Sequence, residues 1–132
     1  HDMDTSALGD PVGLVSGINR IFFPADERGV NIAEASASEL SIPMKRGVIA
    51  SGDLFVADKA KKADITEKFG AAVCEMEGAA IAQTAFVNST PFLVIRAVSD
   101  TADDTSSMDY MQFLPKAAAI SAKLTMEIVE KY

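Results

Sequence analysis

The chain has 132 residues, of which 48% are hydrophobic, and its net charge of −7 arises from 19 acidic and 12 basic residues. This length accommodates one compact core, and the negative charge disfavours nucleic acid and anionic membrane partners. A single cysteine, Cys74, and a single histidine, His1, exclude an internal disulfide and a Cys/His metal cluster, so no metal is expected. The sequence contains no secretory signal or membrane-spanning apolar run, which predicts a cytoplasmic protein.

The first half of the sequence predicts loops, then a helix, a strand and a second helix. Glycines and prolines interrupt residues 1–24, which we expect to be irregular. Apolar residues at helical spacing predict a helix from residue 25 that ends before Pro43, and the apolar run 47–52 predicts a buried strand. Residues 57–69 are lysine-rich and helix-forming, and Gly70 follows where a C-terminal cap belongs.

The second half continues the alternation of strands and helices. Residues 71–76 predict a strand, and the alanine-rich segment 78–87 predicts a helix packed against a sheet. Residues 91–98 are β-branched and apolar on both faces, which predicts a strand at the centre of a sheet. A polar loop over 100–109 and a closing helix over 110–132 complete the chain. This order predicts an α/β fold with largely parallel strands.

Polar residues follow the three predicted strands, and ligands of such sheets bind beyond the carboxyl ends of the strands. Glu75, Glu77 and Asp100 lie at these ends. Carboxyl groups that share a buried cleft have a raised pKa, and a carboxyl protonated near neutral pH is a general acid. The alternative is structural: Glu75 and Glu77 would stabilise the N-terminus of the next helix, and Asp100 would cap a turn.

Three further residues near the predicted strand ends have two interpretations each. Phe55, after the 47–52 strand, could fold into the core or offer an aromatic face to a flat ligand. Met76 could be a core residue or a ligand contact, and Cys74 could be an inert buried thiol or a nucleophile. The chain's one histidine is at position 1, so no base for a cysteine nucleophile is expected.

Taken in order, residues 48–56, 74–82 and 94–100 strongly resemble the methylthioadenosine/S-adenosylhomocysteine nucleosidases, within the wider purine nucleoside phosphorylase superfamily. The opening residues resemble a mid-chain segment of that family, so the resemblance runs nearly end to end. It implies a three-layer α/β/α fold with a mixed, largely parallel central sheet. Residues 1–132 would be the C-terminal portion of a single domain, and the N-terminal part, with its water-activating glutamate, would be a partner.

The resemblance also implies a reaction. The family hydrolyses the N-glycosidic bond of 5'-methylthioadenosine and S-adenosylhomocysteine, with 5'-deoxyadenosine as a further substrate, in adenine and methionine salvage and without a cofactor. Asp100 would protonate N7 of the purine, so that adenine leaves as a neutral base. Glu77 would hold the ribose hydroxyls and stabilise the oxocarbenium-like sugar of the transition state.

The resemblance further implies a substrate-binding set. Phe55 would stack on adenine, the backbone of Val56 would bind the purine edge, and Met76 would pack against the sugar. Arg96 and Ser99 would orient the acid. The complete expected set is Phe55, Val56, Cys74, Glu75, Met76, Arg96 and Ser99.

Family members are homodimers, and Thr5 and Leu8 match the segment that lines the neighbouring subunit's pocket. Three alternatives stay open. The first is a phosphorylase that uses phosphate as nucleophile, although arginine at position 96 resembles the hydrolase version. The second is a related hydrolase of futalosine. The third is an incomplete nucleoside-binding fragment without activity.

Overall fold

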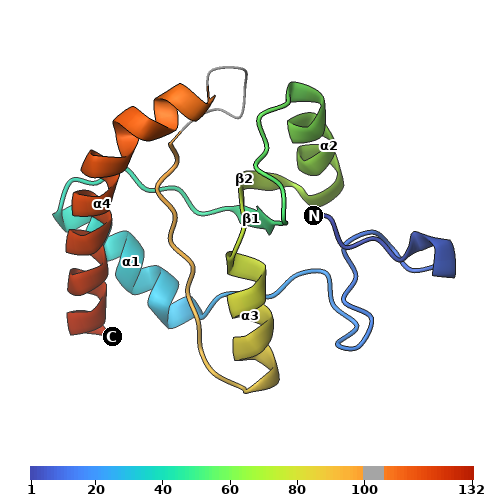
Figure 1. The fold of residues 1–132 in the computed structure, drawn as a ribbon. Coiled ribbons are helices and arrows are strands. Elements are labelled where there is room, and N and C mark those ends of the chain that lie inside the picture. Colours follow the sequence, from blue (N-terminus) through green and yellow to red (C-terminus); the bar gives the residue numbers. More distant parts are fainter. Residues whose placement is uncertain (100–105) are drawn as a thin grey trace. The chain divides into compact units, whose positions relative to one another are not determined.

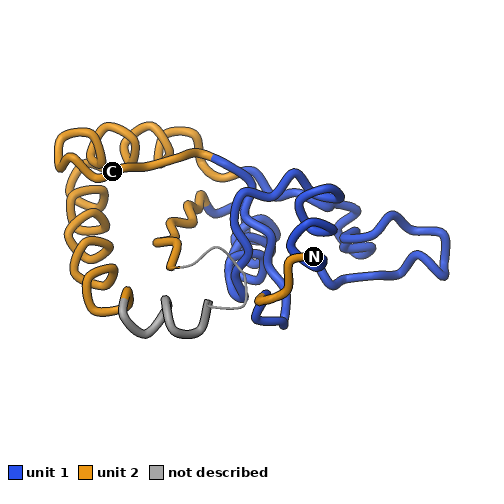
Figure 2. The backbone as a smooth tube through the Cα atoms, turned by 90° about the horizontal axis from the view of Figure 1, so that it is seen from above, with its two compact units in different colours: residues 1–24, 47–56, 60–90 blue, residues 25–46, 57–59, 91–132 orange. Residues whose placement is uncertain are grey.

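The computed structural model of the protein describes residues 1–99 and 106–132, and it describes the side chains of 113–132 in the second of these ranges. These residues form two compact units, each assembled from segments that are distant in sequence (Figure 2). The first unit contains His1–Pro24, Gly47–Val56 and Ala60–Thr90, and the second contains Ala25–Arg46, Ala57–Lys59 and Pro91–Tyr132.

The first unit is built on two parallel strands, β1 (Val48–Ser51) and β2 (Ala71–Glu75), shown in Figure 1. Parallel neighbours need a crossover, which the chain makes through α2 (Lys59–Phe69). The strand register pairs Ser51 with Glu75, so the last residues of both strands lie side by side. The strands predicted over 47–52 and 71–76 and their parallel arrangement are therefore confirmed.

Small side chains let the elements of the first unit pack closely. The helix α3 (Gly78–Val87) packs against β1 and buries Ala82 and Ala85, which leave room for close helix–sheet contact. In α2 the side chain of Ile65 is only 1% exposed. The predicted cap at Gly70 is also confirmed: it adopts a left-handed φ of 62°, and its N–H donates to the carbonyl of Thr66 at 2.9 Å.

The second unit is organised by two packed helices, α1 (Glu27–Glu39) and α4 (Ser106–Lys131). Their core consists of Ala33, Ala37, Leu124 and Ile128, and the partly buried Leu93 and Ile95 pack against it. Asp26 is the N-cap residue of α1, and its carboxylate accepts a hydrogen bond from Gly29 N–H at 2.7 Å. This side chain satisfies one of the amides left without a partner in a first helical turn.

Two expectations for the second half were wrong. Residues 91–98 form no strand within the described structure. The apolar side chains of Leu93 and Ile95 instead pack on the α1–α4 core. Within the described residues, this segment has no partner strand. The closing helix begins at Ser106 and includes residues 106–109, which we expected to be loop. Propensity alone cannot supply a ladder partner.

The N-terminal segment is irregular, as predicted. Residues 1–24 contain one short 3-10 helix, η1 (Ser6–Leu8), and an isolated bridge between Val15 and Arg20. In the described part of the chain, no helix has the length and apolar character needed to cross a membrane.

Candidate active-site edge

The carboxyl ends of β1 and β2 bring two of the three predicted motifs together. Ser51 is the register partner of Glu75, and the next N–H along, that of Gly52, donates to the Glu75 carbonyl at 3.1 Å. Residues 51–56 and 75–77 therefore leave the same edge of the sheet, as expected for a ligand site of a parallel sheet. We call this group of residues the strand-end edge.

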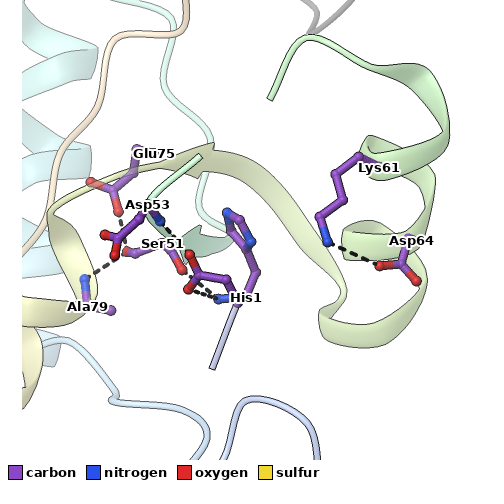
Figure 3. Close-up of polar contacts among 8 residues, drawn as sticks. His1, Ser51, Asp53, Lys61, Asp64, Glu75 and Ala79 are labelled. Atoms are coloured by element: carbon purple, nitrogen blue, oxygen red, sulfur yellow. Dashed lines mark hydrogen bonds and ion pairs between the residues drawn. The ribbon is translucent and has the colours of Figure 1, made fainter. Parts of the chain in front are cut away.

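A hydrogen-bond network fixes the N-terminus of α3 at the strand-end edge (Figure 3). The Glu75 carboxylate accepts from the hydroxyl of Ser51 and from the N–H of Gly78, at 2.9 and 2.8 Å to its two oxygens. It also accepts from Glu77 N–H at 3.2 Å. The Ser51 Oγ in turn accepts from Ala79 N–H at 2.7 Å. Three successive amides at the helix start are thus satisfied by two side chains.

The Glu75 carboxylate lies close to the glycine that begins α3. Gly78 is buried, and a Cβ at this position would lie 2.9 Å from Oε1 of Glu75. Glu77, one residue earlier, is the N-cap residue of α3 and has an exposed side chain. The two glutamates therefore differ in setting: the carboxylate of Glu75 binds the helix start, whereas Glu77 is an exposed residue.

Two apolar side chains of the strand-end edge are exposed. Phe55 is 50% exposed and Met76 is 44% exposed, while Val56 is buried at 8%. Neither side chain therefore belongs to the core of the described structure, and the ligand contacts expected of both stay predictions. The structure places Phe55, Val56, Met76 and Glu77 in the same unit.

The N-terminal segment presents Leu8, which is 83% exposed, on η1. Asp10 stabilises this segment, because its Oδ2 accepts from Ser16 Oγ at 2.7 Å and from Thr5 Oγ1 at 3.0 Å. Hydrogen bonds from Ser16 and then from Thr5 lower the pKa of Asp10. Asp10 was not among the predicted residues, although an acid near serine and threonine among glycines is a signal for a side-chain-stabilised turn.

The other predicted site residues differ in burial and in the unit to which they belong. Cys74 is half-buried on β2, and burial raises the pKa of its thiol. Arg96 is exposed and Ser99 is half-buried, and both belong to the second unit. Asp100, the predicted general acid, lies outside the described residues. Within those residues, no group of three or more His, Cys, Asp or Glu side chains is arranged to hold a metal ion.

Comparisons with known proteins place these observations in a family. The family model of the phosphorylase superfamily matches residues 1–130. The chain is 42% identical, over 99% of its length, to the aminodeoxyfutalosine nucleosidase of Campylobacter jejuni. It is 38% identical, again over 99% of its length, to the 5'-methylthioadenosine/S-adenosylhomocysteine nucleosidase of Bacillus velezensis. It covers 57% of each of these two proteins.

A solved structure gives the same result. The 5'-methylthioadenosine/S-adenosylhomocysteine nucleosidase of Helicobacter pylori, in a crystal structure with butyl-thio-DADMe-Immucillin-A, is similar with a TM-score of 0.94 and 37% identity. The similarity covers 100% of this chain and 56% of the Helicobacter chain. The described strands and helices are those of a phosphorylase fold, of which this chain spans somewhat more than half. With the family model matched from residue 1 to residue 130, the chain belongs to the phosphorylase superfamily.

Proposed function

We propose that the protein containing this chain is a nucleosidase that hydrolyses the N-glycosidic bond of adenine nucleosides modified at the 5' position. The observation that carries the proposal is the register pairing of Ser51 with Glu75. The pairing puts segments 51–56 and 75–77 at one edge of the sheet, and Phe55, Met76 and Glu77 in these segments are exposed. Such a set suits a flat base attached to a polar sugar.

In the proposed mechanism, Phe55 stacks on the base, the Val56 backbone binds its edge and Met76 packs against the sugar. Glu77 accepts hydrogen bonds from the ribose hydroxyls. As the bond to the base breaks, the sugar gains positive charge, and the carboxylate of Glu77 stabilises this charge more strongly than it stabilises the neutral substrate. Asp100 donates a proton to the purine, which then leaves as a neutral base.

Two groups of substrates compete for the assignment. Methylthioadenosine and S-adenosylhomocysteine are supported by the relative from Bacillus velezensis, and aminodeoxyfutalosine is supported by the relative from Campylobacter jejuni. The exposed Leu8 on η1 is the proposed contact with the 5' substituent, supplied to the neighbouring subunit of a homodimer. The proposed water-activating residue belongs to the part of the relatives that this chain does not span.

The test is adenine release in phosphate-free buffer from methylthioadenosine, S-adenosylhomocysteine and aminodeoxyfutalosine, each at matched concentration. The unsubstituted protein should release adenine, and the substrate with the highest kcat/KM identifies the preferred group. Asp100→Asn should lower kcat by at least ~100-fold, the lower range for loss of a general acid. Glu67→Gln removes a carboxylate from the exposed face of α2 and should leave the rate unchanged.

Other outcomes would favour the alternatives. Release that depends on added phosphate would indicate a phosphorylase. Binding of the nucleosides without release would indicate a nucleoside-binding fragment. Unchanged release by Asp100→Asn would contradict the role proposed for that carboxyl group.

A further inference from the structure

The Ser51–Glu75 pair connects the ends of β1 and β2 to the first turn of α3. The segment Met76–Glu77 lies between the end of β2 and the start of α3. Glu75 ends β2 and is held in the sheet by its register partner Ser51. Three residues after Glu75, the chain enters α3 at Gly78. The same two side chains that face each other at the strand ends also bind the first amides of this helix.

We propose that Ser51 and Glu75 are positioning residues that orient Glu77, and that they act through Glu77 and not by touching the substrate. The inference rests on the proposed function, because it assigns a role to the site's own framework. It also gives Glu75 a different role from the substrate contact that the family resemblance implied.

The direction of each hydrogen bond supports this role. The Ser51 hydroxyl donates to Glu75 and accepts from Ala79 N–H at 2.7 Å, so one hydroxyl ties strand, carboxylate and helix together. The Glu75 carboxylate accepts from the N–H groups of Glu77 and Gly78, at 3.2 Å and at 2.8 to 2.9 Å. The peptide groups on both sides of the Glu77 Cα are therefore held by Glu75.

The two glutamates also differ in the electrostatic surroundings of their carboxylates. A negative carboxylate is stabilised at a helix N-terminus by the unpaired amides and the helix dipole. Glu75 occupies this position at α3 and is half-buried, whereas Glu77 carries its carboxylate on an exposed side chain. A sugar cation formed beside Glu77 would then meet a carboxylate whose backbone is fixed in advance, which is the condition for effective electrostatic stabilisation.

The central experiment is a double-mutant cycle on kcat/KM for the preferred nucleoside, measured in single turnovers with enzyme in excess. The variants are Ser51→Ala, Glu77→Gln and the two together. Ser51→Ala should lower kcat by about 10- to 100-fold with little change in KM, because small misplacements of a reacting group cost rates of this order. In the Glu77→Gln background, Ser51→Ala should cause less than a threefold further loss.

Thr84→Ala is the matched control. Thr84 lies on the exposed side of the same helix, and its hydroxyl donates to the Ala80 carbonyl at 2.8 Å. Its removal deletes one hydroxyl hydrogen bond from α3 without touching the strand-end edge, so both kinetic constants should be unchanged. Amide exchange gives a second measurement: Ser51→Ala should accelerate exchange at Ala79, and Thr84→Ala should not.

Glu75→Gln provides a variant of nearly equal volume if Ser51→Ala does not fold. The amide loses the charge at the helix start and one acceptor oxygen, so kcat should again fall and the loss should again vanish in the Glu77→Gln background. Losses that multiply in the double variants would overturn the inference, because Ser51 and Glu75 would then act independently of Glu77. An unsubstituted protein without adenine release would remove the proposed function itself, and the inference with it.

Discussion

The hydroxyl of Tyr132 donates a hydrogen bond to Oδ2 of Asp26 at 3.1 Å, which joins the end of α4 to the start of α1. The same carboxylate oxygen accepts from Gly29 N–H at 2.7 Å. The Asp26 backbone N–H donates to the carbonyl of Phe92 at 2.8 Å. One residue therefore fixes three segments of the second unit through its backbone and its side chain.

Replacement of Asp26 should destabilise the second unit. Asp26→Ala removes an N-cap and the acceptor of the Tyr132 hydroxyl, so the free energy of unfolding should fall by about 1 to 2 kcal/mol. Asp26→Asn keeps an acceptor oxygen and should lose less than half of that. Urea denaturation followed by circular dichroism measures both changes. Equal stability of Asp26→Ala and the unsubstituted protein would contradict the capping role.

The ionisation of Tyr132 should depend on Asp26. Burial and the hydrogen bond to Asp26 raise the pKa of Tyr132. A group whose pKa is raised in the folded state contributes stability that is present below its unfolded pKa of about 10 and is lost as the pH rises through the folded value. Alkaline titration of the phenolate absorbance, with Tyr132→Phe to subtract the other tyrosine, should give a midpoint above that of a free tyrosine. Asp26→Asn should lower this midpoint, and a midpoint at or below the free value would contradict the assignment.

Local sequence signals predicted most elements of the fold. The capping glycine at Gly70, the alanine-rich run of α3 and the apolar run of β1 each encode a structure within one segment. The segment 91–98 was predicted wrongly because a strand also needs a neighbour, and its side chains Leu93 and Ile95 instead pack on the helices of the second unit.

For the site, the sequence predicted the location but not the separate roles of Glu75 and Glu77. Patterning identified the ends of β1 and β2 as the place where polar residues meet, and the register of Ser51 with Glu75 confirms their proximity. Patterning could not separate the roles of Glu75 and Glu77, because both precede a helix. The two glutamates differ because the carboxylate of Glu75 accepts hydrogen bonds from the N–H of Gly78 and from the hydroxyl of Ser51. These contacts depend on the three-dimensional structure and cannot be seen in the sequence pattern.

Gly13 and Gly17 should respond differently to alanine. Gly13 has a φ of +85°, and a Cβ there would lie 2.7 Å from Cε1 of Phe69, whereas Gly17 has nothing within 4 Å. Gly13→Ala should lower the free energy of unfolding by roughly 1 to 3 kcal/mol through backbone strain and overpacking. Gly17→Ala should stay within about 0.5 kcal/mol of the unsubstituted protein. Thermal unfolding of the two variants measures the contrast, and equal effects would contradict the described contact with Phe69.

Cys74 should behave as a poorly reactive thiol. Burial raises the pKa of Cys74, and the thiolate is the form that reacts with alkylating reagents, so the folded protein should be alkylated more slowly than a free cysteine. The rate of reaction with iodoacetamide, followed against pH, should have a midpoint above about 8.5. The same protein in guanidinium chloride is the control, because unfolding exposes the thiol and should return the midpoint to the ordinary value. A folded-state midpoint below that of the unfolded chain would instead indicate an activated cysteine, and it would reopen the nucleophile interpretation that the sequence left beside the buried one.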